Sequence, residues 1–248
     1  MIKVLSIGNS FSQDAQKYLH GVAKSEGENI KCVNLFIGSC SLYTHYSHII
    51  DDKASYSLDF NGESTGFYVS IKEALISDEW NYVTLQQVSH LAPDYETYLP
   101  YIQKLSEYVR TYSPKTKILL HQTWAYEQDS KKLCEEVGFS DQHDMLSKIV
   151  EAYKCAAKDI AADGIIPCGI AMMNAIDRGI GKIHRDTLHA SYGVGRYILA
   201  LTWYTTLTKK IAQNTFSDFD ENVSEEQIKI AKSAVIEAVK DMGIIQRC

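Results

Sequence analysis

The sequence predicts an α/β fold with a mostly parallel sheet between two layers of helices. Short, β-branched apolar runs alternate with longer amphipathic segments along the chain, and no Pro/Gly/Ser-rich linker or internal repeat interrupts them. Parallel strands joined by helices are covered on both faces, which gives such strands their continuous apolar character. We therefore expect a three-layer α/β/α sandwich with a central parallel sheet of about five strands, in a single domain spanning residues 1–248.

The expected strands are short apolar runs bounded by turn or polar residues. The first run ends at Gly8 and the second at Gly38, so both lead into tight turns. In an open parallel sheet the ligand site lies beyond the carboxyl ends of the strands, so residues that follow the strands are the ones to inspect for function. The five expected strands are 2–7, 30–37, 80–85, 116–121 and 164–167.

The expected helices lie between these strands and after the last one. Apolar residues with near-helical spacing predict helices over 12–25, 95–112, 142–162 and from 191 to about 207. Ser224 followed by Gln227 forms a capping-box pattern, so the last helix begins there and is expected to stop near Gly243. Residues 51–70 lack helical periodicity and contain Asn61-Gly62, which predicts a small hairpin insertion.

Composition excludes several classes of function. The chain has 248 residues, is 45% apolar and carries a net charge of −6, which argues against a nucleic-acid partner. No stretch approaches the roughly 18 to 20 apolar residues of a membrane span. The N-terminal apolar run is too short for a signal peptide, so we expect a cytoplasmic protein without a membrane partner. Its six cysteines (Cys32, Cys40, Cys134, Cys155, Cys168 and Cys248) form no C-x-x-C pair and are expected to be free thiols without zinc.

The segment Gly8-Asn9-Ser10-Phe11-Ser12 is the first candidate for chemistry. It follows the first strand and opens a helix, so the Ser10 hydroxyl would project above the sheet beside free backbone N–H groups. Such donors stabilise the negative charge that develops when an acyl carbon is attacked. The structural alternative is a tight turn in which Ser10 or Ser12 caps the helix. A dinucleotide site fits less well, because G-x-G-x-x-G is absent.

Asp186 and His189 are the second candidate. Their spacing of three residues in a turn allows a carboxylate to contact an imidazole, to fix its tautomer and to stabilise its protonated form. The structural alternative is an aspartate that caps a turn beside a surface histidine. His184 lies nearby and is expected to have no catalytic role.

Together these two segments resemble the SGNH or GDSL hydrolase superfamily, in which the serine lies in the first motif and Asp-x-x-His in the last. More closely, the chain is similar to the DUF4886 subgroup. The segments that carry the resemblance are 7–14 (IGNSFSQD), 34–38 (NLFIG), 41–45 (SLYTH), 84–89 (TLQQVS), 124–126 (WAY), 167–171 (PCGIA) and 186–189 (DTLH).

The resemblance implies a Ser10–His189–Asp186 triad and an oxyanion hole with three donors. Ser10 would give its backbone N–H, and Gly38 or Ser39 would give a second. The third departs from the superfamily, because Gln86-Gln87-Val88-Ser89 stands where Gly-x-Asn-Asp is usual. A glutamine amide carries the same NH₂ group as asparagine, so Gln86 or Gln87 is the expected substitute.

Several other residues could contact a ligand. Trp124 and Tyr126, with His121, follow the fourth strand and could stack on a sugar ring or close the edge of the core. Asn174 follows the last strand and could bind substrate or serve a turn. The histidines of the H-x-x-H at 45 and 48 are expected to have structural or pocket-wall roles rather than to bind a metal.

The resemblance thus implies a serine esterase that hydrolyses small O-acyl esters, with O-acetyl groups first, on a small-molecule or carbohydrate substrate. An acyl-enzyme would form on Ser10, and no metal or organic cofactor is required. Two alternatives remain open. One is a non-catalytic carbohydrate-binding protein on the same fold, and the other is a hydrolase acting on lipid or thioester acyl groups.

Overall fold

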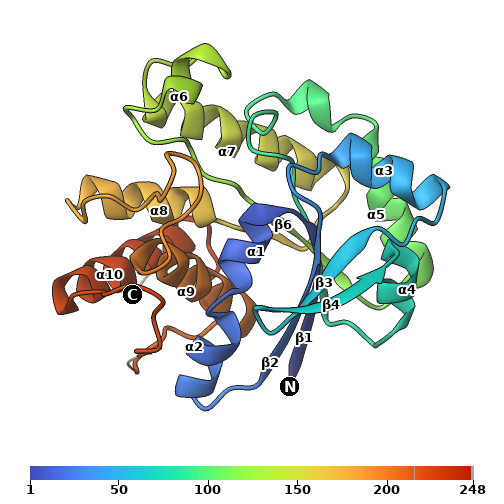
Figure 1. Cartoon of the computed structure of the whole chain (residues 1–248), viewed down its shortest axis with the longest axis horizontal. Coiled ribbons are helices and arrows are strands. Elements are labelled where there is room, and N and C mark those ends of the chain that lie inside the picture. Colours follow the sequence, from blue (N-terminus) through green and yellow to red (C-terminus); the bar gives the residue numbers. More distant parts are fainter. Residues whose placement is uncertain (215, 247–248) are drawn as a thin grey trace.

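A seven-stranded sheet forms the centre of the computed structural model, which describes residues 1–214 and 216–246 (Figure 1). The strand order is β4-β3-β2-β1-β5-β6-β7, so the N-terminal strand lies in the middle. The strands are β1 (Ile2–Gly8), β2 (Ile30–Phe36), β3 (Tyr56–Phe60), β4 (Glu63–Val69), β5 (Tyr82–Leu85), β6 (Lys117–His121) and β7 (Gly164–Ile166).

Five of these strands are parallel, and the sheet has seven rather than the five that the sequence predicts. β1 pairs in parallel with both β2 and β5, which brings the ends of these three strands to one edge of the sheet. The two additional strands form a hairpin over residues 56–69, and β3 pairs antiparallel with β2. Asn61 and Gly62 make its turn with positive φ values of 51° and 85°, as a tight two-residue hairpin turn requires. The hairpin therefore extends the sheet instead of forming a separate insertion.

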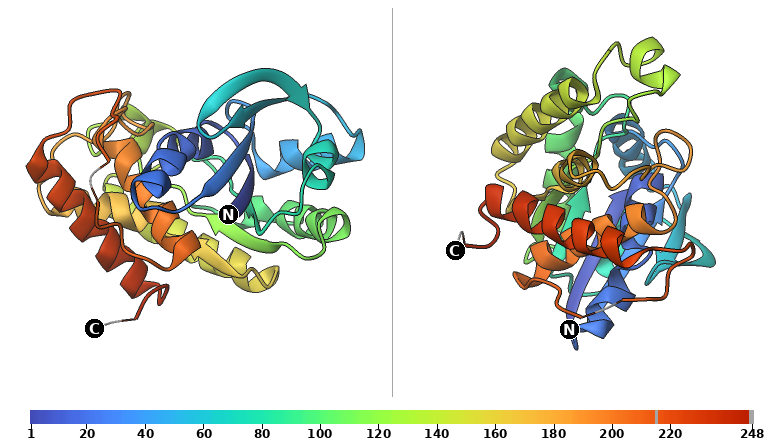
Figure 2. Two further views of the ribbon diagram at one scale, coloured as in Figure 1. Left: turned by 90° about the horizontal axis from the view of Figure 1, so that it is seen from below. Right: turned by 90° about the vertical axis from the view of Figure 1, so that its left-hand side faces the viewer.

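Helices cover both faces of the sheet. One face carries α1, α2, α8, α9 and α10, and the other carries α3, α4, α5 and α7. Figure 2 (left) shows α9 and α10, in orange and red, on the side of the strands opposite to α3 and α5. The helices are α1 (Ser10–Gln16), α2 (Leu19–Ser25), α3 (Leu42–Ile50), α4 (Ile71–Ile76), α5 (Tyr101–Tyr112), α6 (Lys131–Glu135), α7 (Gln142–Asp159), α8 (Cys168–Asp177), α9 (Val194–Thr208) and α10 (Glu225–Asp241).

Two helices that the sequence predicts as continuous are interrupted. The segment 12–25 forms α1 and α2 with a break at residues 17 and 18, and α1 begins two residues earlier than expected. The segment 95–112 forms a 3₁₀ turn (Tyr95–Tyr98) followed by α5, because Pro100 has no N–H with which to continue a helix. The capping box at Ser224 and Gln227 is confirmed, and Gly243 follows α10 with a positive φ.

The cysteines and the helices agree with the composition of the chain. The five cysteines within the described residues are all free, whereas Cys248 lies outside the described residues. In the part of the chain that the structure describes, no helix is both long enough and apolar enough to cross a bilayer.

Three buried histidines give the fold a pH dependence. Burial lowers the pKa of His45 and His121 to about 3 and that of His184 to about 4. In the unfolded chain these histidines titrate near pH 6.5, so below that pH the unfolded state binds more protons than the folded state. Their contribution to stability is complete above about pH 6.5 and is lost progressively as the pH falls toward 4 and 3.

We expect His121→Gln to flatten the dependence of unfolding free energy on pH. Between pH 6 and 5 each buried neutral histidine contributes a slope of up to about 1.4 kcal/mol per pH unit, and the variant lacks one of them. Urea unfolding at pH 7, 6 and 5 measures the slope. The control is His143→Gln, since a hydrogen bond with Asp177 raises the pKa of the exposed His143 and its removal acts in the opposite direction. Equal slopes in wild type and His121→Gln would contradict the prediction.

Candidate active site

Ser10 is the first residue of α1, directly beyond the carboxyl end of β1. Asn9, and neither of the two serines, caps the helix: its Oδ1 accepts the Phe11 N–H at 3.0 Å. Ser12 completes a capping box by accepting the Asn9 N–H at 3.1 Å. A Cβ on Gly8 would lie 2.1 Å from the Ser12 hydroxyl, so the close turn requires glycine. The Ser10 hydroxyl is therefore not used to cap the helix.

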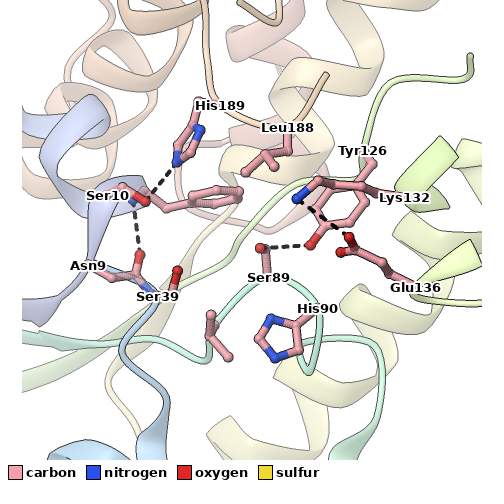
Figure 3. Close-up of a pocket in the computed structure, with 12 residues that line it drawn as sticks. Asn9, Ser10, Ser39, Ser89, His90, Tyr126, Lys132, Glu136, Leu188 and His189 are labelled. Atoms are coloured by element: carbon pink, nitrogen blue, oxygen red, sulfur yellow. Dashed lines mark hydrogen bonds and ion pairs between the residues drawn. The ribbon is translucent and has the colours of Figure 1, made fainter. Parts of the chain in front are cut away.

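Ser10, His189 and Asp186 form a continuous hydrogen-bonded series. The Ser10 Oγ lies 2.9 Å from His189 Nε2 (Figure 3). On the other side of the ring, His189 Nδ1 lies 2.7 Å from Asp186 Oδ2. With the Nδ1 proton donated to the carboxylate, Nε2 is the lone-pair nitrogen that accepts from the serine hydroxyl. The structure thus brings together three side chains that the sequence separates by up to 179 residues.

The Asp186 carboxylate is held in its ionised form by the turn that contains it. Its Oδ1 accepts the backbone N–H groups of His189 at 2.8 Å and Leu188 at 3.3 Å. Burial raises the pKa of Asp186, but the hydrogen bonds from the His189 backbone and ring outweigh this and lower it below its usual value. Thr187 has a φ of 70°, which closes the turn tightly enough for both N–H groups to reach one oxygen.

A cavity of about 180 Å³ opens beside Ser10 and His189. Figure 3 shows its far wall, where Lys132 and Glu136 form an ion pair of 3.5 Å near the Tyr126 hydroxyl, which in turn bonds Ser89 at 3.0 Å. Most of the lining side chains are polar. The lining residues are Asn9, Ser10, Phe11, Ser39, Val88, Ser89, His90, Tyr126, Lys132, Glu136, Leu188 and His189.

The expected glutamine donors do not reach this cavity. Gln86 is 2% exposed; its Nε2 donates to Asn9 Oδ1 at 2.6 Å and its Oε1 accepts from His121 Nδ1 at 2.8 Å. Gln87 is also buried, and its Nε2 donates to Thr97 while its Oε1 accepts the N–H of Leu42. Both amide groups are therefore committed to the scaffold, which corrects the expectation that one of them faces an oxyanion.

The loop after β2 lies against the turn that carries Ser10, and Asn9 makes the contact. Asn9 Nδ2 donates to the Cys40 carbonyl at 3.1 Å, and the Cys40 N–H closes a turn onto the Ile37 carbonyl at 3.3 Å. Ser39, within this turn, lines the cavity and has a φ of 55°. Within the described residues, neither the Ser10 nor the Ser39 backbone N–H donates to a protein acceptor. Gly38, the other expected donor, precedes Ser39 in the turn and does not line the cavity.

Trp124 does not form a platform on which a sugar ring could stack, which is one of the two roles that the sequence allows. It is 1% exposed, its ring stacks on Phe11 with centroids 4.0 Å apart, and its Nε1 donates to the Leu188 carbonyl at 2.8 Å. Its faces are therefore unavailable to a sugar, and it joins the nucleophile segment to the His189 turn. Tyr126 lines the cavity only partly, since it too is buried and bonds Ser89.

Asn174 lies away from the cavity, in α8. Its Nδ2 donates to the Ala234 carbonyl of α10 at 3.3 Å, so the structure gives it a helix-packing contact and not the substrate contact that the sequence suggested. The H-x-x-H histidines also lie elsewhere. His45 is buried with Nδ1 2.8 Å from the Tyr56 hydroxyl, and His48 contacts the same hydroxyl at 3.2 Å. Among the described residues no group of His, Cys, Asp or Glu side chains is suited to hold a metal.

Four residues that line the cavity were not predicted from the sequence. Ser89 and His90 follow the two glutamines, and Lys132 and Glu136 belong to the short helix α6 or its end. The spacing of Lys132 and Glu136 predicts an ion pair on one helix face, but such pairs are common on any surface helix. Only the path of the chain after β6 brings this pair over the cavity.

Comparison with known proteins identifies the family. A model of the family described as "Domain of unknown function (DUF4886)" matches residues 3–238. The chain belongs to the DUF4886 family. A crystal structure of a DUF4886 family protein from Bacteroides uniformis is 36% identical, covers 96% of this chain and 94% of that one, and superposes with a TM-score of 0.89. No curated protein matches the chain.

More distant solved structures share the fold of this DUF4886 chain. A candidate SGNH hydrolase from Slackia heliotrinireducens is 22% identical, covers 82% of this chain and 97% of that one, and has a TM-score of 0.58. An acetylxylan esterase from Geobacillus stearothermophilus is 12% identical, with 86% and 97% coverage and a TM-score of 0.54. The DUF4886 chain therefore has the SGNH hydrolase fold.

Trp124→Phe tests the bridge between the two halves of the site. The substitution keeps a ring to stack on Phe11 but removes the N–H that Leu188 accepts, so a buried carbonyl loses its partner. We expect the free energy of unfolding to fall by about 1–3 kcal/mol, measured by urea unfolding. Tyr126→Phe, which removes only a hydroxyl at the cavity, is the comparison and should cost less. An unchanged stability in Trp124→Phe would show that the bond to Leu188 contributes nothing.

Proposed function

We propose that this DUF4886 protein is a serine esterase that hydrolyses small O-acyl esters, O-acetyl esters in the first place, through an acyl-enzyme on Ser10. The observation that carries the proposal is the Ser10–His189–Asp186 series, with heavy-atom distances of 2.9 and 2.7 Å. Nucleophile, base and orienting carboxylate in hydrogen-bonding reach are the geometry that nucleophilic catalysis requires.

In the proposed acylation step, Ser10 Oγ attacks the ester carbonyl carbon while His189 Nε2 takes the hydroxyl proton. Asp186, a carboxylate at neutral pH whose pKa the hydrogen bonds of its turn lower further, stabilises the imidazolium that results. When the tetrahedral intermediate collapses, the C–O bond to the alcohol breaks and His189 returns the proton to the leaving oxygen. Water, deprotonated by the same nitrogen, then attacks the acyl-enzyme and releases the acid and free Ser10.

The proposed oxyanion hole consists of backbone groups alone. The Ser10 and Ser39 N–H groups have no protein acceptor among the described residues, and both residues line the cavity. With Gln86 and Gln87 committed elsewhere, the hole has two donors rather than three. Loss of one donor typically reduces turnover on the order of 10²–10³-fold, so we expect a slow enzyme on simple esters.

The cavity lining favours a polar, short-chain substrate. Ser89, His90 and the Lys132–Glu136 pair offer both donors and acceptors, which suit the hydroxyl groups of a sugar. The acetylxylan esterase that shares the fold acts on such an ester, and by analogy we propose an acylated carbohydrate as the substrate class. A long lipid acyl chain would require an apolar channel, for which the lining is less suitable. A non-catalytic carbohydrate-binding protein is the competing proposal.

We expect hydrolysis of p-nitrophenyl acetate that is abolished in Ser10→Ala and reduced by on the order of 10³-fold or more in His189→Ala. Activity should fall at acid pH, because a protonated imidazole cannot accept the serine proton. A fluorophosphonate probe should label Ser10 in the wild type and fail to label Ser10→Ala.

His143→Ala is the matched control for His189→Ala. Like His189, His143 contacts an aspartate through Nδ1, with Asp141 at 3.1 Å, but its Nε2 contacts a second aspartate, Asp177, at 2.9 Å; it is exposed and does not line the cavity. The esterase activity of His143→Ala should equal that of the wild type. If neither the ester nor the probe reacts with the wild type, the esterase proposal fails and carbohydrate binding, measured by calorimetry with acetylated and free oligosaccharides, becomes the leading function.

Ser39→Gly tests whether the backbone N–H of Ser39 or its side-chain hydroxyl would donate to the oxyanion. Glycine keeps the N–H and relieves the positive φ of 55°, so we expect turnover within about twofold of wild type and stability higher by about 0.5–1 kcal/mol. Turnover and urea unfolding measure the two effects. A loss of on the order of 10²-fold in turnover would show instead that the Ser39 hydroxyl holds the oxyanion.

A further inference from the structure

A buried carboxylate joins the nucleophile helix to the turn that carries Asp186 and His189. Asp14 lies one helical turn after Ser10 in α1 and is 1% exposed. Its two oxygens accept hydrogen bonds from Arg185 Nη1 at 3.0 and 2.8 Å, and Oδ1 also accepts one from Arg196 Nε at 2.9 Å. Neither arginine is close to Asp14 in sequence, so this cluster is a tertiary contact between the two parts of the triad.

Arg185 holds both ends of the catalytic turn. It directly precedes Asp186, its backbone N–H donates to the His189 carbonyl at 3.0 Å, and its guanidinium also donates to the carbonyl of Ala190. The Nη1 of Arg196, which lies in α9, donates to Asp220 Oδ2 at 2.9 Å. The Tyr192 ring lies over both guanidinium groups, 4.7 and 4.5 Å from its centroid, and covers the cluster from the outside.

The triad contacts themselves are too exposed to fix this geometry. The Asp186 side chain is 50% exposed and that of His189 is 23% exposed. Water competes for such a pair, and exposed ion pairs contribute little to stability. A displacement of about 1 Å at a reacting contact nevertheless reduces turnover by on the order of 100-fold. Contacts centred on the Asp14 carboxylate are better shielded, because that side chain is 1% exposed and the two arginines that bind it are 20% and 12% exposed.

We propose that Asp14, Arg185 and Arg196 form a positioning clamp that sets the distance between Ser10 Oγ and His189 Nε2. Breaking the clamp would leave a buried charge without its partner, so the two segments move little against each other. Asp14 touches neither the substrate cavity nor the reacting atoms. The inference rests on the proposed esterase function, since turnover is one of its readouts.

The decisive comparison is between Asp14→Asn and Arg185→Gln. The first removes a negative charge and the second removes a positive charge, so a purely electrostatic influence on His189 would move the acid limb of kcat/KM in opposite directions. A clamp that positions the turn predicts instead that both variants lose kcat in the same direction, by on the order of 10- to 100-fold with KM little changed. Asp220→Asn, which removes the exposed carboxylate from Arg196, is the matched control and should stay within about twofold of wild type.

Hydrogen–deuterium exchange provides a readout that does not depend on turnover. The Arg185, Leu188 and His189 amides donate hydrogen bonds within the turn, and we expect them to exchange at least about tenfold faster in Asp14→Asn and Arg185→Gln. If Asp14→Asn does not fold, Arg185→Gln alone decides, because Asp14 then keeps Arg196 as its partner. Arg185→Lys, which keeps the charge, should recover part of the lost turnover.

The outcomes distinguish the clamp from the function on which it rests. Lower thermal stability with unchanged kcat per folded molecule and unchanged exchange in the turn would overturn the clamp and leave the esterase intact. Opposite shifts of the acid limb without loss of kcat would also overturn it, in favour of electrostatics. An inactive wild type whose turn exchanges faster in both variants would refute the esterase and retain the clamp.

Discussion

The carboxamide of Asn9 joins the ends of three parallel strands at the edge of the sheet that carries the site. Its oxygen accepts from the Phe11 backbone and from Gln86, and its nitrogen donates to the Cys40 carbonyl. These partners belong to the segments after β1, β5 and β2. Because all three hydrogen bonds are buried, loss of the carboxamide would leave several polar atoms unpaired at once. The nucleophile turn, the Ser39 loop and the end of β5 therefore keep a common register.

Gln86 is part of this arrangement. It is long enough to reach from the end of β5 to Asn9, at the end of the adjacent β1, while its oxygen stays bonded to His121 at the end of β6. The amide thus supports the backbone that forms the proposed oxyanion hole rather than donating to the oxyanion itself. The cost is one fewer donor in the cavity.

The second half of the site reaches the first through apolar and charged contacts on one face of the sheet. Trp124 stacks on Phe11 and bonds Leu188, while Asp14 bonds Arg185. A stacked aromatic pair adds about 0.5–1.5 kcal/mol of stability beyond that of the surface area it buries. The ion pairs of Asp14 also fix the orientation of the groups that they join. Both kinds of contact join the segment of Ser10 to the turn of His189, whose side chain is itself partly open to solvent.

The sequence was sufficient for the fold class, which depends on local features, whereas the three side chains that the structure brings together were expected only through the family resemblance. Apolar periodicity marks strands and helices, and a serine after a strand or an Asp-x-x-His turn is visible in a few residues. The strand count was low because β3 and β4 are half-exposed and carry no continuous apolar run. The fates of Gln86, Gln87, Trp124 and Asn174 were wrong or open because a polar side chain at a strand end does not reveal which neighbour it will bond. That choice depends on the strand order and on helices more than 30 residues away in the chain.

The central position of β1 has a consequence for the order of events during synthesis. Ser10 is translated 179 residues before its partner His189, whose turn is anchored by α9, which ends at Thr208. A nascent chain therefore carries the proposed nucleophile without its base until that later segment has been translated. In the proposed mechanism the Ser10 hydroxyl has no general base throughout that period, and its reactivity would arise only when the last helices pack on the sheet.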